Sequence, residues 1–79
     1  MSSSEKILTM LKDIRPEYEF EDSDNFIEDG YLDSFDVVTL VAELEAAFSI
    51  KIDGLDIVPE NFSSVETIIE TVNKNGGNI

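Results

Sequence analysis

The chain has 79 residues, enough for one small domain with a single core, and its 18 acidic and 5 basic side chains give a formal net charge of −13. This charge argues against nucleic acids and anionic lipids as partners and favours basic protein surfaces. Because cysteine and histidine are absent and no apolar stretch approaches the length of a membrane span, the composition argues against disulfides, thiolate or histidine chemistry, and membrane insertion.

The N-terminal segment predicts a helix. Ser2 and Glu5 have the spacing of a capping box, in which two side chains bond the backbone at a helix start. Pro16 blocks continuation of this helix. Between these signals, the apolar residues at helical spacing are Ile7, Leu8, Leu11 and Ile14.

The segment from Glu17 to Asp33 has no sustained periodicity and predicts a long loop. We expect its scattered apolar side chains to hold the loop against the core. These side chains are Tyr18, Phe20, Phe26, Ile27, Tyr31 and Leu32.

A second helix is predicted from Ser34 to Phe48, with Asp33 as its cap and Asp36 in the first turn, where the helix dipole favours an acid. The short β-branched segment from Ile50 to Ile52 ends it, and a turn at Asp53-Gly54 follows.

The remaining sequence predicts two more helical segments. Leu55 to Val58 has room for one helical turn before Pro59. A second capping box, at Ser63 and Glu66, opens a third main helix that ends near Asn75-Gly76-Gly77. The apolar face of this helix consists of Val65, Ile68, Ile69 and Val72.

These elements predict an all-α fold, a bundle of three main helices and one short helix with a long loop between the first two. We expect a single domain over residues 1–79. The lack of cysteine favours a cytoplasmic protein over a small secreted one. We also expect the protein to be a monomer.

The second predicted helix has two apolar faces. One is an obvious core stripe of Val37, Leu40, Val41, Leu44 and Phe48. The opposite side carries Ser34 and a second apolar stripe, and acids flank that stripe. Because a small domain has few elements left to cover it, we expect partner proteins to bind there, although burial inside the bundle is the alternative. The predicted partner-binding residues are Asp36, Val38, Ala42, Glu43, Glu45 and Ala46.

Asp33-Ser34-Phe35 on its own is ordinary capping chemistry. It nevertheless resembles the Asp-Ser-Leu attachment motif of the acyl carrier protein family, which includes peptidyl and D-alanyl carrier proteins. The resemblance covers nearly the whole chain. Its other segments are Gly30-Tyr31-Leu32, Leu44-Glu45-Ala46-Ala47-Phe48, Ile50-Lys51-Ile52 and Pro59-Glu60-Asn61-Phe62.

This resemblance implies an acyl-carrier-type four-helix bundle in which Ser34 bears 4'-phosphopantetheine, with Asp33 and Phe35 completing the attachment motif. It also implies that a separate phosphopantetheinyl transferase, using magnesium, adds the group from coenzyme A. Ser34 then needs no histidine, because the transferase supplies the base and the metal. The chain would be a carrier that holds its cargo as a thioester, with no catalytic residue and no metal site of its own.

The type of carrier is less directly indicated. Fatty-acid-type carriers are rich in acids on the partner face of this helix, whereas the matching positions here are Thr39, Glu45 and Ala46. Phe35 also replaces the usual leucine of the motif. We therefore expect a free-standing carrier served by a dedicated enzyme, such as an adenylating ligase that loads an amino acid or unusual acyl group, and not one used in bulk fatty acid synthesis.

Other classes fit less well. The acidic loop from Asp22 to Gly30 resembles a calcium loop only in composition, because Phe26 would occupy a ligand position and Ile27 the position that needs glycine. A serine hydrolase would need a base near Ser34, but the chain has no histidine and its lysines lie far along the sequence. The remaining alternative is an acidic adaptor or inhibitor in which Ser34 stays unmodified.

Overall fold

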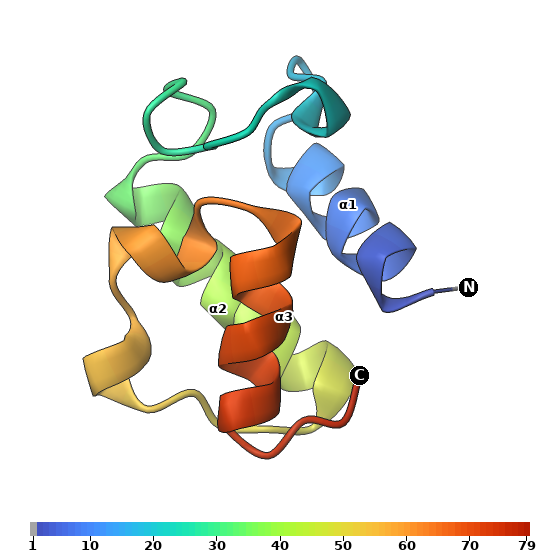
Figure 1. Cartoon of the computed structure of the whole chain (residues 1–79), viewed down its shortest axis with the longest axis vertical. Coiled ribbons are helices and arrows are strands. Elements are labelled where there is room, and N and C mark those ends of the chain that lie inside the picture. Colours follow the sequence, from blue (N-terminus) through green and yellow to red (C-terminus); the bar gives the residue numbers. More distant parts are fainter. Residues whose placement is uncertain (1) are drawn as a thin grey trace.

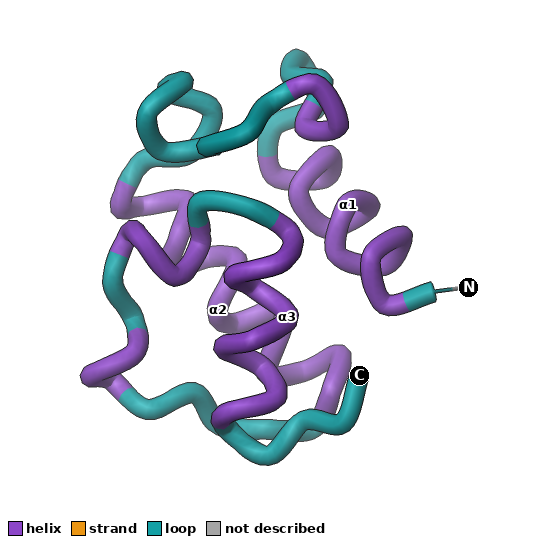
Figure 2. The backbone as a smooth tube through the Cα atoms, in the orientation of Figure 1, coloured by secondary structure: helices purple, strands orange, loops and turns teal. Residues whose placement is uncertain are grey.

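The computed structural model describes residues 2–79, and all regular secondary structure in that range is helical (Figures 1 and 2). Three α-helices are present there, α1 (Ser3–Ile14), α2 (Ser34–Phe48) and α3 (Val65–Lys74). Three short 3₁₀ helices join them, η1 (Phe20–Asp22), η2 (Gly54–Asp56) and η3 (Pro59–Phe62). The predicted all-α bundle is therefore confirmed. None of the helices within residues 2–79 combines the length and apolar character needed to cross a bilayer.

The α2 helix begins and ends where the sequence predicted. The Asp33 side chain accepts a hydrogen bond from the Asp36 amide at the N-terminus. At the other end Ser49 adopts a left-handed backbone, with φ 56°, and its N–H donates to the Glu45 carbonyl. Both ends of α2 are thus capped by local contacts.

The connection between α2 and α3 differs from the prediction in two places. The expected turn from Leu55 to Val58 is replaced by η2 and η3, because the Asp53 side chain caps the Leu55 amide and Pro59 starts a separate turn. The capping box of α3 lies one residue later, at Ser64 and Thr67.

Ser63 was the predicted cap of α3 and has a different role. Its backbone is already helical, with φ −85° and ψ −17°, and its hydroxyl donates to the Glu60 carbonyl at 2.9 Å. Ser63 therefore closes η3, and the extended backbone that an N-cap needs is found at Ser64.

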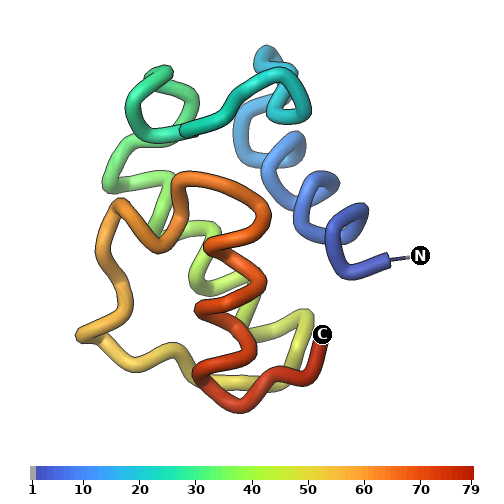
Figure 3. Tube along the Cα trace, viewed as in Figure 1, coloured from blue at the N-terminus to red at the C-terminus, as the bar shows by residue number. Residues whose placement is uncertain are grey.

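The loop from α1 to α2 is held against the core, as expected. It crosses the same end of both helices (Figure 3). Its Phe20, Phe26 and Leu32 side chains are buried. Tyr18 stacks on Tyr31 with ring centroids 4.4 Å apart, which fastens the beginning of the loop to its end.

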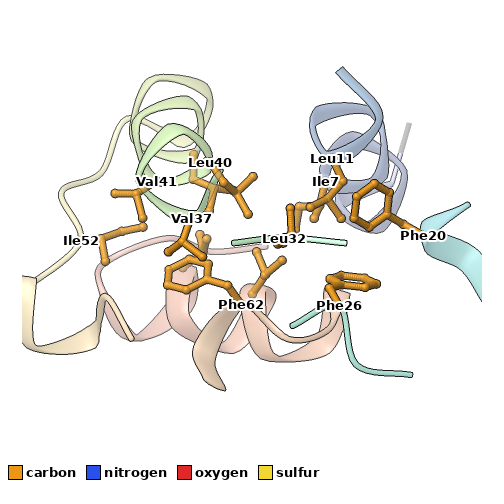
Figure 4. Close-up of a cluster of buried hydrophobic side chains, with 13 residues drawn as sticks. Ile7, Leu11, Phe20, Phe26, Leu32, Val37, Leu40, Val41, Ile52 and Phe62 are labelled. Carbon is orange, nitrogen blue, oxygen red and sulfur yellow. The ribbon is translucent and has the colours of Figure 1, made fainter. Parts of the chain in front are cut away.

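A single cluster of buried apolar side chains joins the three α-helices and the loop (Figure 4). Ile7 and Leu11 come from α1, and Leu40 and Val41 from α2. Phe62 enters from η3 and is fully buried. The three α-helices, the loop and η3 therefore share one core, and α2 is packed against it through Leu40 and Val41.

A matched pair of phenylalanines tests this assignment. Replacing the fully buried Phe62 by Ala should lower the free energy of unfolding by about 3–5 kcal/mol, because it leaves a cavity in the core. Replacing Phe35, which is 81% exposed, by Ala should change it by less than about 0.5 kcal/mol. Urea unfolding followed by circular dichroism measures both values. Similar losses for the two variants would contradict the core described above.

Candidate functional site

Ser34 is the first residue of α2 and is exposed. The backbone of Asp33 before it is extended, with ψ −179°, so the chain turns into the helix at this point. The neighbouring Phe35 is 81% exposed. The hydroxyl of Ser34 is therefore accessible from solvent.

Two aspartates fix the backbone around Ser34. The Asp36 amide donates to Asp33 Oδ1 at 2.9 Å, and the Asp33 amide donates to Asp36 Oδ2 at 3.2 Å. This reciprocal capping box satisfies two backbone donors at the helix start. It also restrains the backbone of the two residues between the aspartates, Ser34 and Phe35.

Arg15, at the C-terminal end of α1, connects that helix to the capping box. Its Nε donates to Asp36 Oδ2 at 2.8 Å, and its Nη2 lies 3.5 Å from Asp33 Oδ2. Glu17 is a more distant partner, at 3.7 Å. We refer to Arg15, Asp33 and Asp36 as the cap network. Through it, one guanidinium offsets the charge of both carboxylates beside Ser34.

The cap network also shifts ionisation. The hydrogen bond from the Asp36 amide, together with the nearby charge of Arg15, lowers the pKa of Asp33. The hydrogen bond to Asp36 raises the pKa of Arg15. Both groups are thus charged at neutral pH.

Asp36 does not lie on the partner surface to which the sequence assigned it. Its residue is only 7% exposed, and its carboxylate is used by Arg15 and by the Asp33 amide. The reason is that its flank of α2 faces the end of α1. Its observed role is to hold the start of α2.

The loop before Ser34 adds a second restraint. The Phe26 carbonyl accepts hydrogen bonds from the amides of Tyr31 and Leu32, at 2.8 and 3.2 Å. Gly30 turns the chain with φ 76°, a backbone that glycine adopts without strain. The Phe26 amide in turn donates to the Ser63 carbonyl at 2.7 Å. The loop segment that precedes Ser34 is thus hydrogen-bonded to the residues just before α3.

The second apolar stripe of α2 is exposed, so the alternative that the bundle covers it is wrong. Phe35 is 81% and Val38 64% exposed, and Ala42 and Ala46 are also exposed. We call these four residues the α2 outer stripe. It begins beside Ser34 and runs down the helix.

Two further acids flank the stripe and are partly withdrawn from solvent. Glu45 is half-buried, and its carboxylate accepts a hydrogen bond from the Ile52 amide at 2.9 Å. Glu43 is also half-buried, and its Oε2 is buried without a hydrogen-bond partner among residues 2–79. Neither acid presents a fully free carboxylate to a partner.

Sequence reasoning missed the roles of two residues, Arg15 and Leu55. Arg15 could not be paired with Asp36 from spacing, because the contact depends on how α1 and α2 pack. Leu55 was expected in a helical turn, but it is 87% exposed in η2. Its only signal in the sequence is an apolar residue next to the Asp53-Gly54 turn.

The site suits a covalently attached phosphate group. Ser34 offers an exposed hydroxyl, the N-terminal end of α2 favours a negative charge, and Arg15 lies within the same cap network. Comparison with known families agrees with this geometry. The family model described as "phosphopantetheine attachment site" matches residues 5–72.

The chain belongs to the phosphopantetheine attachment site family. This domain is the site at which 4'-phosphopantetheine is covalently attached. Carrier domains of this family are generally non-catalytic and are modified by a transferase. Neither a curated protein nor a solved structure gave a significant match to the chain. Residues 2–79 contain no group of three or more acidic side chains placed to hold a metal ion.

The cap network of this carrier should be sensitive to acid. The lowered pKa of Asp33 means that its contribution to stability is present above its unfolded pKa of about 3.9 and is lost as the pH falls through the lower folded value. Arg15→Gln should therefore lower the urea midpoint clearly at pH 7, and the difference from the unaltered protein should narrow below about pH 4. Circular dichroism at pH 7, 5, 4 and 3 measures this.

Lys12→Gln is the control for that experiment. Lys12 forms an exposed ion pair with Glu21 at 2.7 Å, with about half of each side chain in solvent. Exposed pairs contribute little, so its midpoint shift at pH 7 should be the smaller one. An Arg15→Gln effect of the same size at pH 7 and pH 3 would show that the cap network does not act through charge.

Proposed function

We propose that Ser34 is the residue that carries 4'-phosphopantetheine, placed there from coenzyme A by a separate transferase. The protein then tethers an acyl or aminoacyl group as a thioester and passes it between enzymes. The observation that carries this proposal is the exposed Ser34 at the first residue of α2, inside a chain whose residues 5–72 match the attachment family. The attached group supplies the thiol that this cysteine-free chain lacks.

In this proposal the residues around Ser34 position the serine and expose it to partner enzymes. Asp33 and Asp36 hold Ser34 at the start of α2, and Arg15 limits the charge repulsion that an added phosphodiester would meet from Asp33. Phe35 projects into solvent on the other side of the serine. It is therefore available to contact the transferase or a later enzyme.

Intact mass spectrometry tests the attachment. Incubation with coenzyme A, magnesium and a promiscuous phosphopantetheinyl transferase should add one phosphopantetheine group to the unaltered protein and none to Ser34→Ala. Ser4→Ala, which removes an exposed hydroxyl in α1, should be modified as the unaltered protein is. An unaltered protein that gains no mass would favour the alternative of an acidic adaptor or inhibitor.

We further propose that a dedicated loading enzyme, such as an adenylating ligase, supplies the cargo, in place of bulk fatty acid synthesis. Support comes from the α2 outer stripe, whose exposed members Phe35, Val38, Ala42 and Ala46 are apolar. The acids that might have offered charge, Asp36 and Glu45, are used inside the domain. Docking on this face then depends on apolar contact more than on charge pairs.

Turnover by a purified fatty acid elongation system tests this preference. The loaded protein should be elongated at least about tenfold less efficiently than that system's own carrier, a loss of about 1.4 kcal/mol in docking. Thr39→Glu with Ala46→Glu, both at exposed positions of α2, should recover part of the loss by restoring acids. Elongation as efficient as that of the cognate carrier would exclude the preference for a dedicated enzyme.

A further inference from the structure

A groove lies on a face of the molecule to which α2 contributes no residue. It has a volume of about 600 Å³, within the range of small binding sites. The residues that line it come from the first half of α1, the loop around η1 and the beginning of α3. Figure 1 shows how these three elements are arranged. The groove is thus separate from both Ser34 and the α2 outer stripe.

The floor of this groove is apolar. Phe20 and Phe26 are each 1% exposed and pack edge to face, with ring centroids 5.0 Å apart. Leu8 from α1 and Val65 from α3 complete it, and both are half-exposed. Apolar groups of a ligand would therefore find a preformed surface.

The rim of the groove is acidic. Its charged residues are Glu21, Asp24 and Glu66, all exposed, and no basic residue lines the groove. Glu21 is paired with Lys12. Asp24 and Glu66 form no ion pair with any other of residues 2–79. Two unpaired carboxylates thus stand on different walls above an apolar floor.

This combination excludes most occupants. An anion would be repelled by the rim, and a plain acyl chain would bury the floor at the expense of desolvating carboxylates. A second copy of the chain has only 5 basic residues among 79 and a net charge of −13, so it offers little that would complement the rim. What matches is a cation with an apolar stem.

We propose that this groove binds an arginine side chain, next to an apolar residue, from an enzyme that docks on the carrier. The arginine stem lies on Leu8 and Val65, and its planar guanidinium reaches the free carboxylates of Asp24 and Glu66. Arginine is also the charged residue most enriched at protein interfaces. The groove gives the carrier a second docking point, which does not depend on any group attached to Ser34.

Titration of the full-length, ¹⁵N-labelled protein with the blocked tripeptide acetyl-Leu-Arg-Leu-amide tests the proposal. Backbone amide shifts should concentrate at Leu8, Glu21, Asp24, Val65 and Glu66 and should saturate at millimolar peptide. The same peptide with citrulline, a neutral analogue of arginine, should produce shifts at least about fivefold smaller. Shifts spread evenly over the acidic surface, or equal for the two peptides, would overturn the proposal.

Two double variants distinguish the effect of the groove carboxylates on peptide affinity from the effect of the overall negative charge. Asp24→Asn with Glu66→Gln should raise the dissociation constant about three- to tenfold, as expected for the loss of two exposed ion pairs. Asp13→Asn with Glu70→Gln makes the same change in net charge at exposed positions outside the groove, and should leave the dissociation constant within about twofold. Equal effects of the two variants would refute the site, and attachment at Ser34 would be unaffected by either result.

Discussion

The contact between Arg15 and the buried carboxylate of Asp36 is the constraint that organises this domain around its serine. It joins the end of α1 to the first turn of α2 across the whole intervening loop. Asp36 can be buried because its carboxylate is paired with Arg15 and also accepts a hydrogen bond from the Asp33 amide. The position of Ser34 therefore depends on a tertiary contact as well as on local capping.

The same contact explains why α2 can be apolar on two sides. Its inner face fills the core, with Leu40 and Leu44 fully buried. Asp36 and Glu45 on its two flanks bond to other parts of the chain. The carboxylates of these two acids are thus bonded within the domain, and the α2 outer stripe is an apolar surface beside Ser34.

Local signals predicted much of this fold. The limits of α2 followed from Asp33 as cap and from the apolar periodicity, and both are properties of adjacent residues. The cap of α3 was placed one residue early, because Ser63 has Glu66 three residues later, as a capping box requires, whereas Ser64 has Thr67. The helical backbone of Ser63 at the end of η3 moves the cap to Ser64. The prediction that Asp36 is exposed to partner proteins was wrong for a different reason. A helical projection gives the angle of a side chain about its own axis, but not where a neighbouring helix lies.

For the site too, features set by neighbouring residues could be predicted from the sequence, whereas features set by tertiary contacts could not. The exposure of Ser34, Phe35 and Val38 was predictable from the helix and its two apolar stripes. Arg15 was not, since its partners are far along the chain and no spacing rule relates them. The groove beside α1 was equally inaccessible, because its lining combines residues from three separated segments.

Charge and apolar contact have separate roles in a carrier of this kind. A net charge of −13 acts at a distance and speeds the approach of basic enzymes, but at physiological salt it is screened beyond about 8 Å. Release must remain easy, because a carrier visits more than one enzyme, and a small apolar stripe makes a short-lived contact. Placing the unpaired acids Asp24 and Glu66 on another face from the stripe allows steering and docking to be adjusted independently. An enzyme that contacted both faces would have to match the chain in shape as well as in charge.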